Sequence, residues 1–87
     1  MDIQKLNAFL CVAKHQNFTK ASEELFISQP ALSKKISDFE KELGVKLLER
    51  NNRLVTLTPA GKTLFNEAPP ILDVLNGLTK KVQQIGM

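Results

Sequence analysis

Side chains that read base pairs are concentrated in a short stretch after position 28. Gln pairs with adenine, Lys reaches guanine or phosphate, Ser bonds bases or phosphates, and Pro contacts a thymine methyl group. The stretch contains all four types: Gln29, Pro30, Ser33, Lys34 and Ser37. Apolar residues repeat between them at helical intervals of four, three and four: Leu32, Ile36, Phe39 and Leu43. The pattern predicts a helix with a buried stripe and an outer face suited to a DNA groove.

Groups for catalysis or metal binding are scarce. The chain has one cysteine, Cys11, and one histidine, His15, with no Gly-rich phosphate loop and no nucleophile–base pair. We therefore expect no enzyme, and neither a metal ion nor a cofactor. Cys11 stands among apolar neighbours and is interpreted as a small core residue rather than a redox sensor. His15 is interpreted as a helix-end residue rather than a ligand or base.

Length and composition set further bounds. The 87 residues, 43% apolar and 24% charged, fit one globular domain. The longest apolar run, residues 8–13, is too short to cross a membrane or form a signal-peptide core. One cysteine makes no intramolecular disulfide, so a partner chain is the remaining means of stabilising a thin core. We expect a soluble domain of a reducing compartment, in which the placement of charge counts more than its net value of +3.

Three helices are predicted in the first half of the chain. Apolar residues at helical spacing follow the candidate N-cap Asp2 as far as Ala13, and a short helix is expected over residues 19–26, after a break at Asn17. The third helix, residues 29–43, is bounded by Ser28 as N-cap and Gly44 as terminator. The last two of these helices have the arrangement of a helix-turn-helix.

A short hairpin and a long helix are predicted in the second half. Asparagines at positions 51 and 52 separate residues 47–50 from the β-favouring residues 54–57, which indicates a hairpin. Thr58 and Pro59 are typical of a helix start. Pro69 and Pro70 lie within that helix, where each removes a backbone donor, so we expect a kink or a short interruption there.

The final helix carries an apolar stripe that we call the heptad seam. Its members follow one another at intervals of 4, 3, 4, 3, 4 and 3: Leu64, Ala68, Ile71, Leu75, Leu78, Val82 and Ile85. This spacing is typical of helices that pack on one another. The seam predicts a dimer, although packing on the domain's own core is the alternative.

Several motifs resemble the N-terminal domain of LysR-type transcriptional regulators. They are FTKASEELFISQPALS at 18–33, LGV at 43–45, LLER at 47–50 and LTPAG at 57–61, and the resemblance covers nearly the whole chain. It implies a mainly α fold: a winged helix-turn-helix of three helices and a two-stranded wing over residues 1–58, then a dimerising linker helix over 59–87. It also implies binding of double-stranded DNA at promoters with an imperfect inverted repeat, and hence transcriptional regulation.

The resemblance assigns roles to particular residues. Base-reading positions are matched by Gln29, Pro30, Ser33 and Lys34. Backbone contacts are matched by Thr19, Ser28 and Lys35, and the wing region by Arg50 and Arg53. For Arg50, bracing of the wing through a carboxylate is an open alternative to DNA contact, and for Lys35 plain solvation is one.

The chain also departs from the family pattern. Ser22 stands where Ala is usual, Leu48 where Phe is commoner, and Pro69-Pro70 where the linker helix is normally continuous. The family's larger C-terminal effector-binding domain is missing, so we expect an isolated DNA-binding fragment or a naturally short relative. The expected partners are double-stranded DNA and a second copy of the chain, and a full-length protein could form a tetramer. A small-molecule effector is expected only in the C-terminal domain, and no contact with a membrane is expected. The expected location is the cytoplasm, at the nucleoid. A dimerisation module without DNA binding is the alternative function.

Overall fold

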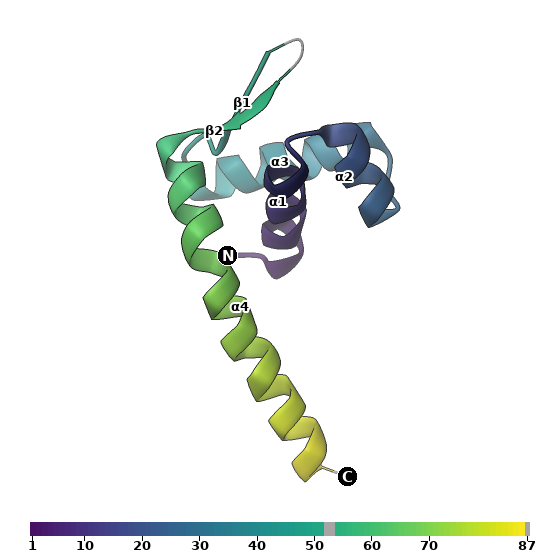
Figure 1. Ribbon diagram of the computed structural model, residues 1–87, viewed down its shortest axis with the longest axis vertical. Coiled ribbons are helices and arrows are strands. Elements are labelled where there is room, and N and C mark those ends of the chain that lie inside the picture. Colours follow the sequence, from purple (N-terminus) through teal and green to yellow (C-terminus); the bar gives the residue numbers. More distant parts are fainter. Residues whose placement is uncertain (52–53, 87) are drawn as a thin grey trace.

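The computed structural model describes residues 1–51 and 54–86 and contains helices with one small hairpin (Figure 1). The elements follow in the order α1 (Ile3–His15), α2 (Phe18–Leu25), α3 (Gln29–Leu43), β1 (Leu48–Arg50), β2 (Val55–Leu57) and α4 (Pro59–Ile85). The predicted mainly α fold with a two-stranded wing is confirmed. The hairpin and the free end of α4 project in opposite directions from the body formed by α1, α2 and α3 (Figure 1).

Side-chain caps fix where the helices begin. The Asp2 carboxylate accepts from the backbone N–H of Gln4 at 2.8 Å, and the Ser28 hydroxyl accepts from the N–H of Ala31 at 3.2 Å. These contacts satisfy N–H groups that have no partner within the helix. Asn17 caps α2 in the same way, so α2 begins at Phe18, one residue earlier than predicted. The predicted limits of α3 are confirmed.

The core lies where α1 packs against α2 and α3. Phe9 and Val12 of α1 are fully buried, as are Leu32, Ile36 and Phe39 of α3. The predicted apolar stripe of α3 is thereby confirmed over its first three members, and Leu43 at its end is half-buried. Cys11 is buried as predicted, at 6% exposure.

The hairpin is attached to the end of α3 by a buried carboxylate. Its two strands are antiparallel, with Leu48 opposite Leu57 and Arg50 opposite Val55. Glu40 of α3 is only 9% exposed, and its Oε2 accepts from the backbone N–H groups of Leu47 at 2.7 Å and Leu48 at 3.2 Å. Because these N–H groups are buried, losing their acceptor would be costly. Glu40 therefore fixes the start of the wing relative to α3.

The long helix α4 is anchored to the body by its first turns. Gly61 is buried, and a Cβ atom added there would collide with the backbone oxygen of Leu47. Ala68 is 4% exposed, and Leu64, Phe65 and Leu72 pack partly against the core. Beyond Leu72 the helix extends away from the body, and the molecule measures 50 × 27 × 20 Å.

Of the two expected effects of the prolines, a kink or an interruption, the structure excludes the interruption. α4 is one helix from Pro59 to Ile85, with Pro69 and Pro70 inside it. Each proline removes one N–H, which leaves the carbonyl groups of Phe65 and Asn66 without that intrahelical donor. Both prolines are exposed, so water can take the place of the missing donors.

Among the helices of the described residues, none combines the length and apolar character needed to span a membrane.

Candidate nucleic-acid interface

The turn between α2 and α3 sets the position of α3. Phe26 ends α2 in the left-handed region at φ 57°, and its N–H bonds back to the last turn of the helix. The next N–H, of Ile27, donates to the carbonyl of Ser22 at 3.1 Å. Ala21 and Ser22 are buried, and small side chains here let the helices approach closely. The Ser22 that departs from the family pattern therefore fits the crossing.

The first turns of α3 present the predicted base-reading groups. Gln29, Pro30 and Lys34 are exposed, and Ser33 is half-buried. The Gln29 amide donates from Nε2 to the hydroxyl of Thr19 at 3.0 Å. This bond joins the first turn of α3 to the first turn of α2, so two of the predicted DNA contacts are held side by side. It leaves the Gln29 amide oxygen and the Thr19 hydroxyl proton available to other partners.

Lys34 is exposed and pairs with the carboxylate of Asp38 on the same helix. Its Nζ lies 2.9 Å from Oδ2, and its side chain is 77% exposed. The hydrogen bond from Lys34 holds the pKa of the Asp38 carboxyl below its usual value. An exposed pair of this kind is weak, so the lysine can exchange the carboxylate for a phosphate.

Lys35 has a different setting from Lys34. Its side chain is half-buried and lines a hollow that it shares with Gln4 and Asn7 of α1. The adjacent lysines therefore do not share one face of α3. Contact of Lys35 with the DNA backbone stays a prediction.

Arg50 connects the wing with both helices of the helix-turn-helix. From β1 its Nη1 donates to the hydroxyl of Ser33 at 2.8 Å, and its guanidinium lies 3.9 Å from the ring centroid of Phe18. The first contact reaches α3 and the second reaches the start of α2. Bracing thus occurs through a hydroxyl and an aromatic ring, and no carboxylate of the described residues pairs with Arg50. Ser33 accepts this bond and keeps its own proton for a base or phosphate.

Ser28 and Ser37, two further polar residues around α3, differ in their exposure. Ser28 caps α3 through its oxygen and is exposed, so its proton can be donated to a phosphate. Ser37 is half-buried. Arg53, predicted at the tip of the wing, lies outside the described residues. Sequence reasoning missed Glu40 as a positioning residue, because nothing in its local pattern distinguishes it from the exposed acids around it.

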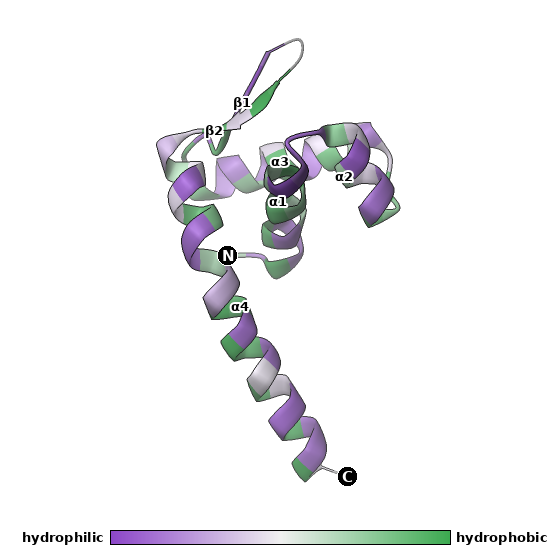
Figure 2. Cartoon of the chain, in the orientation of Figure 1, coloured by the Kyte–Doolittle hydropathy of each residue, from purple (hydrophilic) through white to green (hydrophobic). Residues whose placement is uncertain are grey.

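The heptad seam is divided between two environments. Leu64 is half-buried and Ala68 is buried, both against the chain's own core. From position 71 onward the seam is uncovered in the single chain, with exposed fractions between 38% and 86%. Its exposed members are Ile71, Leu75, Leu78, Val82 and Ile85. Figure 2 shows hydrophobic and hydrophilic segments alternating along this free part of α4.

Three helices, a wing anchored on α3 and a polar outer face at the start of α3 define a winged helix-turn-helix domain. Residues 3–62 match the family model described as bacterial regulatory helix-turn-helix protein, lysR family. The chain belongs to that family.

Relatives of known sequence and structure agree with this membership. The probable cat1 operon transcriptional activator of Acinetobacter lwoffii is 39% identical over 87 residues, which are all of this chain and 29% of that protein. A crystal structure of the BenM DNA-binding domain with catB site 1 DNA has a TM-score of 0.91 and 37% identity, covering 99% of this chain and 96% of that one. The complex of the CbnR DNA-binding domain with DNA has a TM-score of 0.92 and 31% identity, and each chain is covered completely.

Proposed function

We propose that this chain binds double-stranded DNA as a dimer and is the DNA-reading part of a transcriptional regulator. The observation that carries the proposal is the exposed polar start of α3, held against the wing by the contact between Arg50 and Ser33. The structural similarity to BenM and CbnR domains determined on DNA supports it. On this proposal the chain acts by binding and performs no catalysis.

The start of α3 would enter the major groove. Gln29, Ser33 and Lys34 would select bases, with Pro30 against a thymine methyl group. Thr19, Ser28 and Lys35 would contact the backbone, together with the wing residue Arg53. Arg50 would act mainly by holding the wing against α3, because both of its contacts are within the chain. Asp38 and the later turns of α3 would lie farther from the duplex.

The dimer would form through the uncovered part of the heptad seam. Two copies related by a two-fold axis would place two α3 helices in major grooves about 34–36 Å apart, or a multiple of that distance. Such a dimer suits an imperfect inverted repeat at a promoter. The unit of reading would be residues 1–58 and the unit of dimerisation 59–87, with the start of α4 shared between them. This assembly would work in the cytoplasm, at the nucleoid.

The chain spans 29% of the length of the cat1 operon activator. A full-length protein of that size would have room for a C-terminal domain that binds a small-molecule effector. We place effector control and any tetramer in that domain, and DNA reading in the residues described above.

The test is equilibrium binding of the chain to duplex DNA at graded salt concentrations. The proposal predicts that log K falls linearly with log salt, with a slope of about −0.9 for each phosphate neutralised. Lys35→Gln, at a predicted backbone contact, is expected to reduce this slope by about one. Lys80→Gln makes the same charge change on an exposed part of α4 and should leave the slope unchanged. Absence of duplex binding by a chain that still dimerises would replace the proposal with a dimerisation module.

A further inference from the structure

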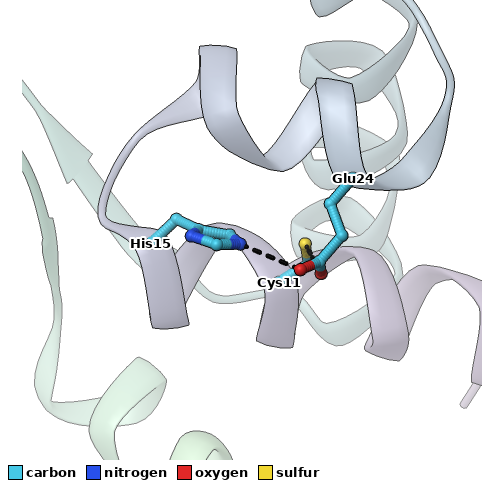
Figure 3. Close-up of side chains that lie close together, drawn as sticks. All are labelled: Cys11, His15 and Glu24. Atoms are coloured by element: carbon cyan, nitrogen blue, oxygen red, sulfur yellow. Dashed lines mark hydrogen bonds and ion pairs between the residues drawn. The ribbon is translucent and has the colours of Figure 1, made fainter.

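Three side chains with metal-binding atoms converge where α1 packs on α2. Cys11 and His15 are one turn apart on α1, and Glu24 lies in the last turn of α2 (Figure 3). Glu24 Oε2 is 2.8 Å from the Cys11 sulfur, and Glu24 Oε1 is 3.2 Å from His15 Nε2. One ligand atom from each residue can be chosen so that all three lie within 4.8 Å of one another. The chain's one cysteine and one histidine therefore face the same carboxylate.

The donor set matches the preferences of a particular ion. Zn²⁺ takes thiolate sulfur, imidazole nitrogen and carboxylate oxygen, at about 2.0–2.3 Å. Four ligands at those distances in a tetrahedron lie roughly 3.3–3.8 Å apart. The observed separations of 2.8 and 3.2 Å lie just below this range, and all three donors lie within 4.8 Å of one another, so small side-chain rotations would bring them into place. A mixed set of sulfur, nitrogen and oxygen donors does not suit Mg²⁺ or Ca²⁺, which prefer oxygen.

The cluster is open to solvent on one side. Cys11 lies beneath it with 6% exposure, whereas the side chains of His15 and Glu24 are 24% and 47% exposed. An ion can therefore enter from solvent and keep a water molecule as its fourth ligand. Lys14 is a competitor, with its Nζ 3.4 Å from Glu24 Oε1. Its side chain is 64% exposed, so it can move into solvent when an ion takes its place.

We propose that Cys11, His15 and Glu24 form a zinc site that joins the end of α1 to the end of α2. Binding replaces the hydrogen of the thiol with the metal ion and releases the proton to solvent, so the Cys11 sulfur binds as thiolate. The bound ion would hold α1 and α2 together, and α2 carries Thr19 at its other end.

In the absence of an ion the same groups form a hydrogen-bonded cluster. Burial, followed by the contact with Glu24, raises the pKa of the Cys11 thiol to about 11. The thiol is therefore neutral and unreactive near pH 7, which agrees with its interpretation as a core residue. The sequence did not indicate a site because the third ligand comes from another helix and shares no spacing motif with the first two.

Titration of the purified chain with Co²⁺, followed by displacement with Zn²⁺, tests the proposal. We expect an absorption band from thiolate-to-cobalt charge transfer and visible bands of four-coordinate cobalt, both removed by zinc. Cys11→Ser should abolish the charge-transfer band. His15→Ala and Glu24→Gln should each weaken binding at least about tenfold, the loss that even an outer-sphere partner can cause.

Two matched variants define the specificity of this test. Glu23→Gln changes the neighbouring exposed carboxylate and should leave the affinity unchanged, whereas Lys14→Ala removes the competitor and should raise it. Far-ultraviolet circular dichroism without metal shows whether each variant is folded. If Cys11→Ser does not fold, the Co²⁺ affinities of His15→Ala and Glu24→Gln test the site. A missing charge-transfer band in the wild-type chain, or wild-type affinity for Co²⁺ in both His15→Ala and Glu24→Gln, would overturn the site.

Discussion

Gln29 and Thr19 hold each other in place across the first turns of α3 and α2. Their 3.0 Å bond fixes the amide without using its oxygen, so the group is oriented before it meets a base. A side chain ordered in advance loses less conformational freedom on binding than a free one. At the scale of single residues, sequence preference is therefore expected to depend on Gln29 more than on its neighbours.

Gln29→Ala is expected to weaken binding to the preferred duplex by about 1–3 kcal/mol and to blur the choice of base at one position. Thr19→Val is the matched variant, because it breaks the bond between the two side chains and keeps the amide. Thr19→Val should lose less affinity than Gln29→Ala, and part of its loss should appear on every duplex. Fluorescence anisotropy with preferred and scrambled duplexes measures the affinity of each variant. Equal weakening of Gln29→Ala on the two duplexes would contradict a base-reading role.

The pair formed by Lys34 and Asp38 gives a second prediction at this scale. The pKa of Asp38 is lowered by its hydrogen bond with Lys34, so any stability from the pair is present above the usual pKa of 3.8 and lost as pH falls through the lower folded value. Lys34→Gln should return the pKa of Asp38 toward 3.8, as measured by NMR titration of its carboxyl carbon. Asp38→Asn should strengthen duplex binding, because it removes a negative charge and leaves Lys34 without its partner carboxylate. An unchanged Asp38 pKa in Lys34→Gln would contradict the pairing.

At the scale of elements, the wing depends on contacts from α3. Glu40 satisfies two backbone N–H groups where the wing begins, and Arg50 returns from β1 to Ser33. The hairpin has only three residues in each strand, and isolated hairpins of two strands are marginal in water. Its position therefore depends on α3 as well as on its own pairing.

Glu40→Ala is expected to destabilise the chain by about 2–4 kcal/mol, because two buried donors lose their acceptor. Glu40→Gln retains an acceptor oxygen and should lower the free energy of unfolding by less. Chemical denaturation followed by circular dichroism measures the free energy of unfolding of each variant. A loss below about 0.5 kcal/mol in Glu40→Ala, the range of an ordinary surface change, would show that the carboxylate does not hold the wing.

Caps, terminators and apolar spacing in the sequence predicted the helices and the hairpin. They could not predict contacts between residues that are far apart in the chain. Ser28 and Gly44 mark the two ends of α3 within the sequence itself, and both ends are confirmed. The two prolines of α4 do not interrupt the helix, and the local sequence could not decide between a kink and an interruption, because the cost of each proline depends on whether water reaches the freed carbonyl group. The contact between Arg50 and Ser33 spans 17 positions and unites two elements, so no local pattern contains it. Gln29, Pro30 and Lys34 are exposed opposite the buried stripe, because one helical period determines both faces of α3, whereas their contacts with DNA stay a prediction.

At the scale of the whole molecule, α4 separates two tasks. Its start packs on the body through Ala68 and the buried Gly61, and its end presents an uncovered apolar seam. Exposed apolar patches of this kind mark interaction sites. In the proposed dimer, a second copy of the same helix would supply a matching stripe.

Leu78→Asp is expected to raise the dissociation constant of the dimer at least about 100-fold, because an unpaired charge in an apolar contact costs about 3 kcal/mol or more. The affinity for a symmetric duplex should fall as the dimer weakens. Asn76→Asp adds the same charge to an exposed position off the seam and serves as the control. Sedimentation equilibrium measures the dimer, and an unchanged dissociation constant in Leu78→Asp would remove the seam from the interface.

The proposed function requires two copies of this chain to read two half-sites through the starts of their α3 helices. Selection of bound duplexes from a random pool, at several salt concentrations, tests this requirement. The proposed function predicts enrichment of two-fold symmetric duplexes whose half-site centres lie about 10–10.5 base pairs apart, or a multiple of that. The base preference should be relaxed when Gln29→Ala is used instead. Recovery of duplexes with no shared half-site, or of the same symmetric site by Gln29→Ala, Ser33→Ala and Lys34→Gln alike, would contradict it.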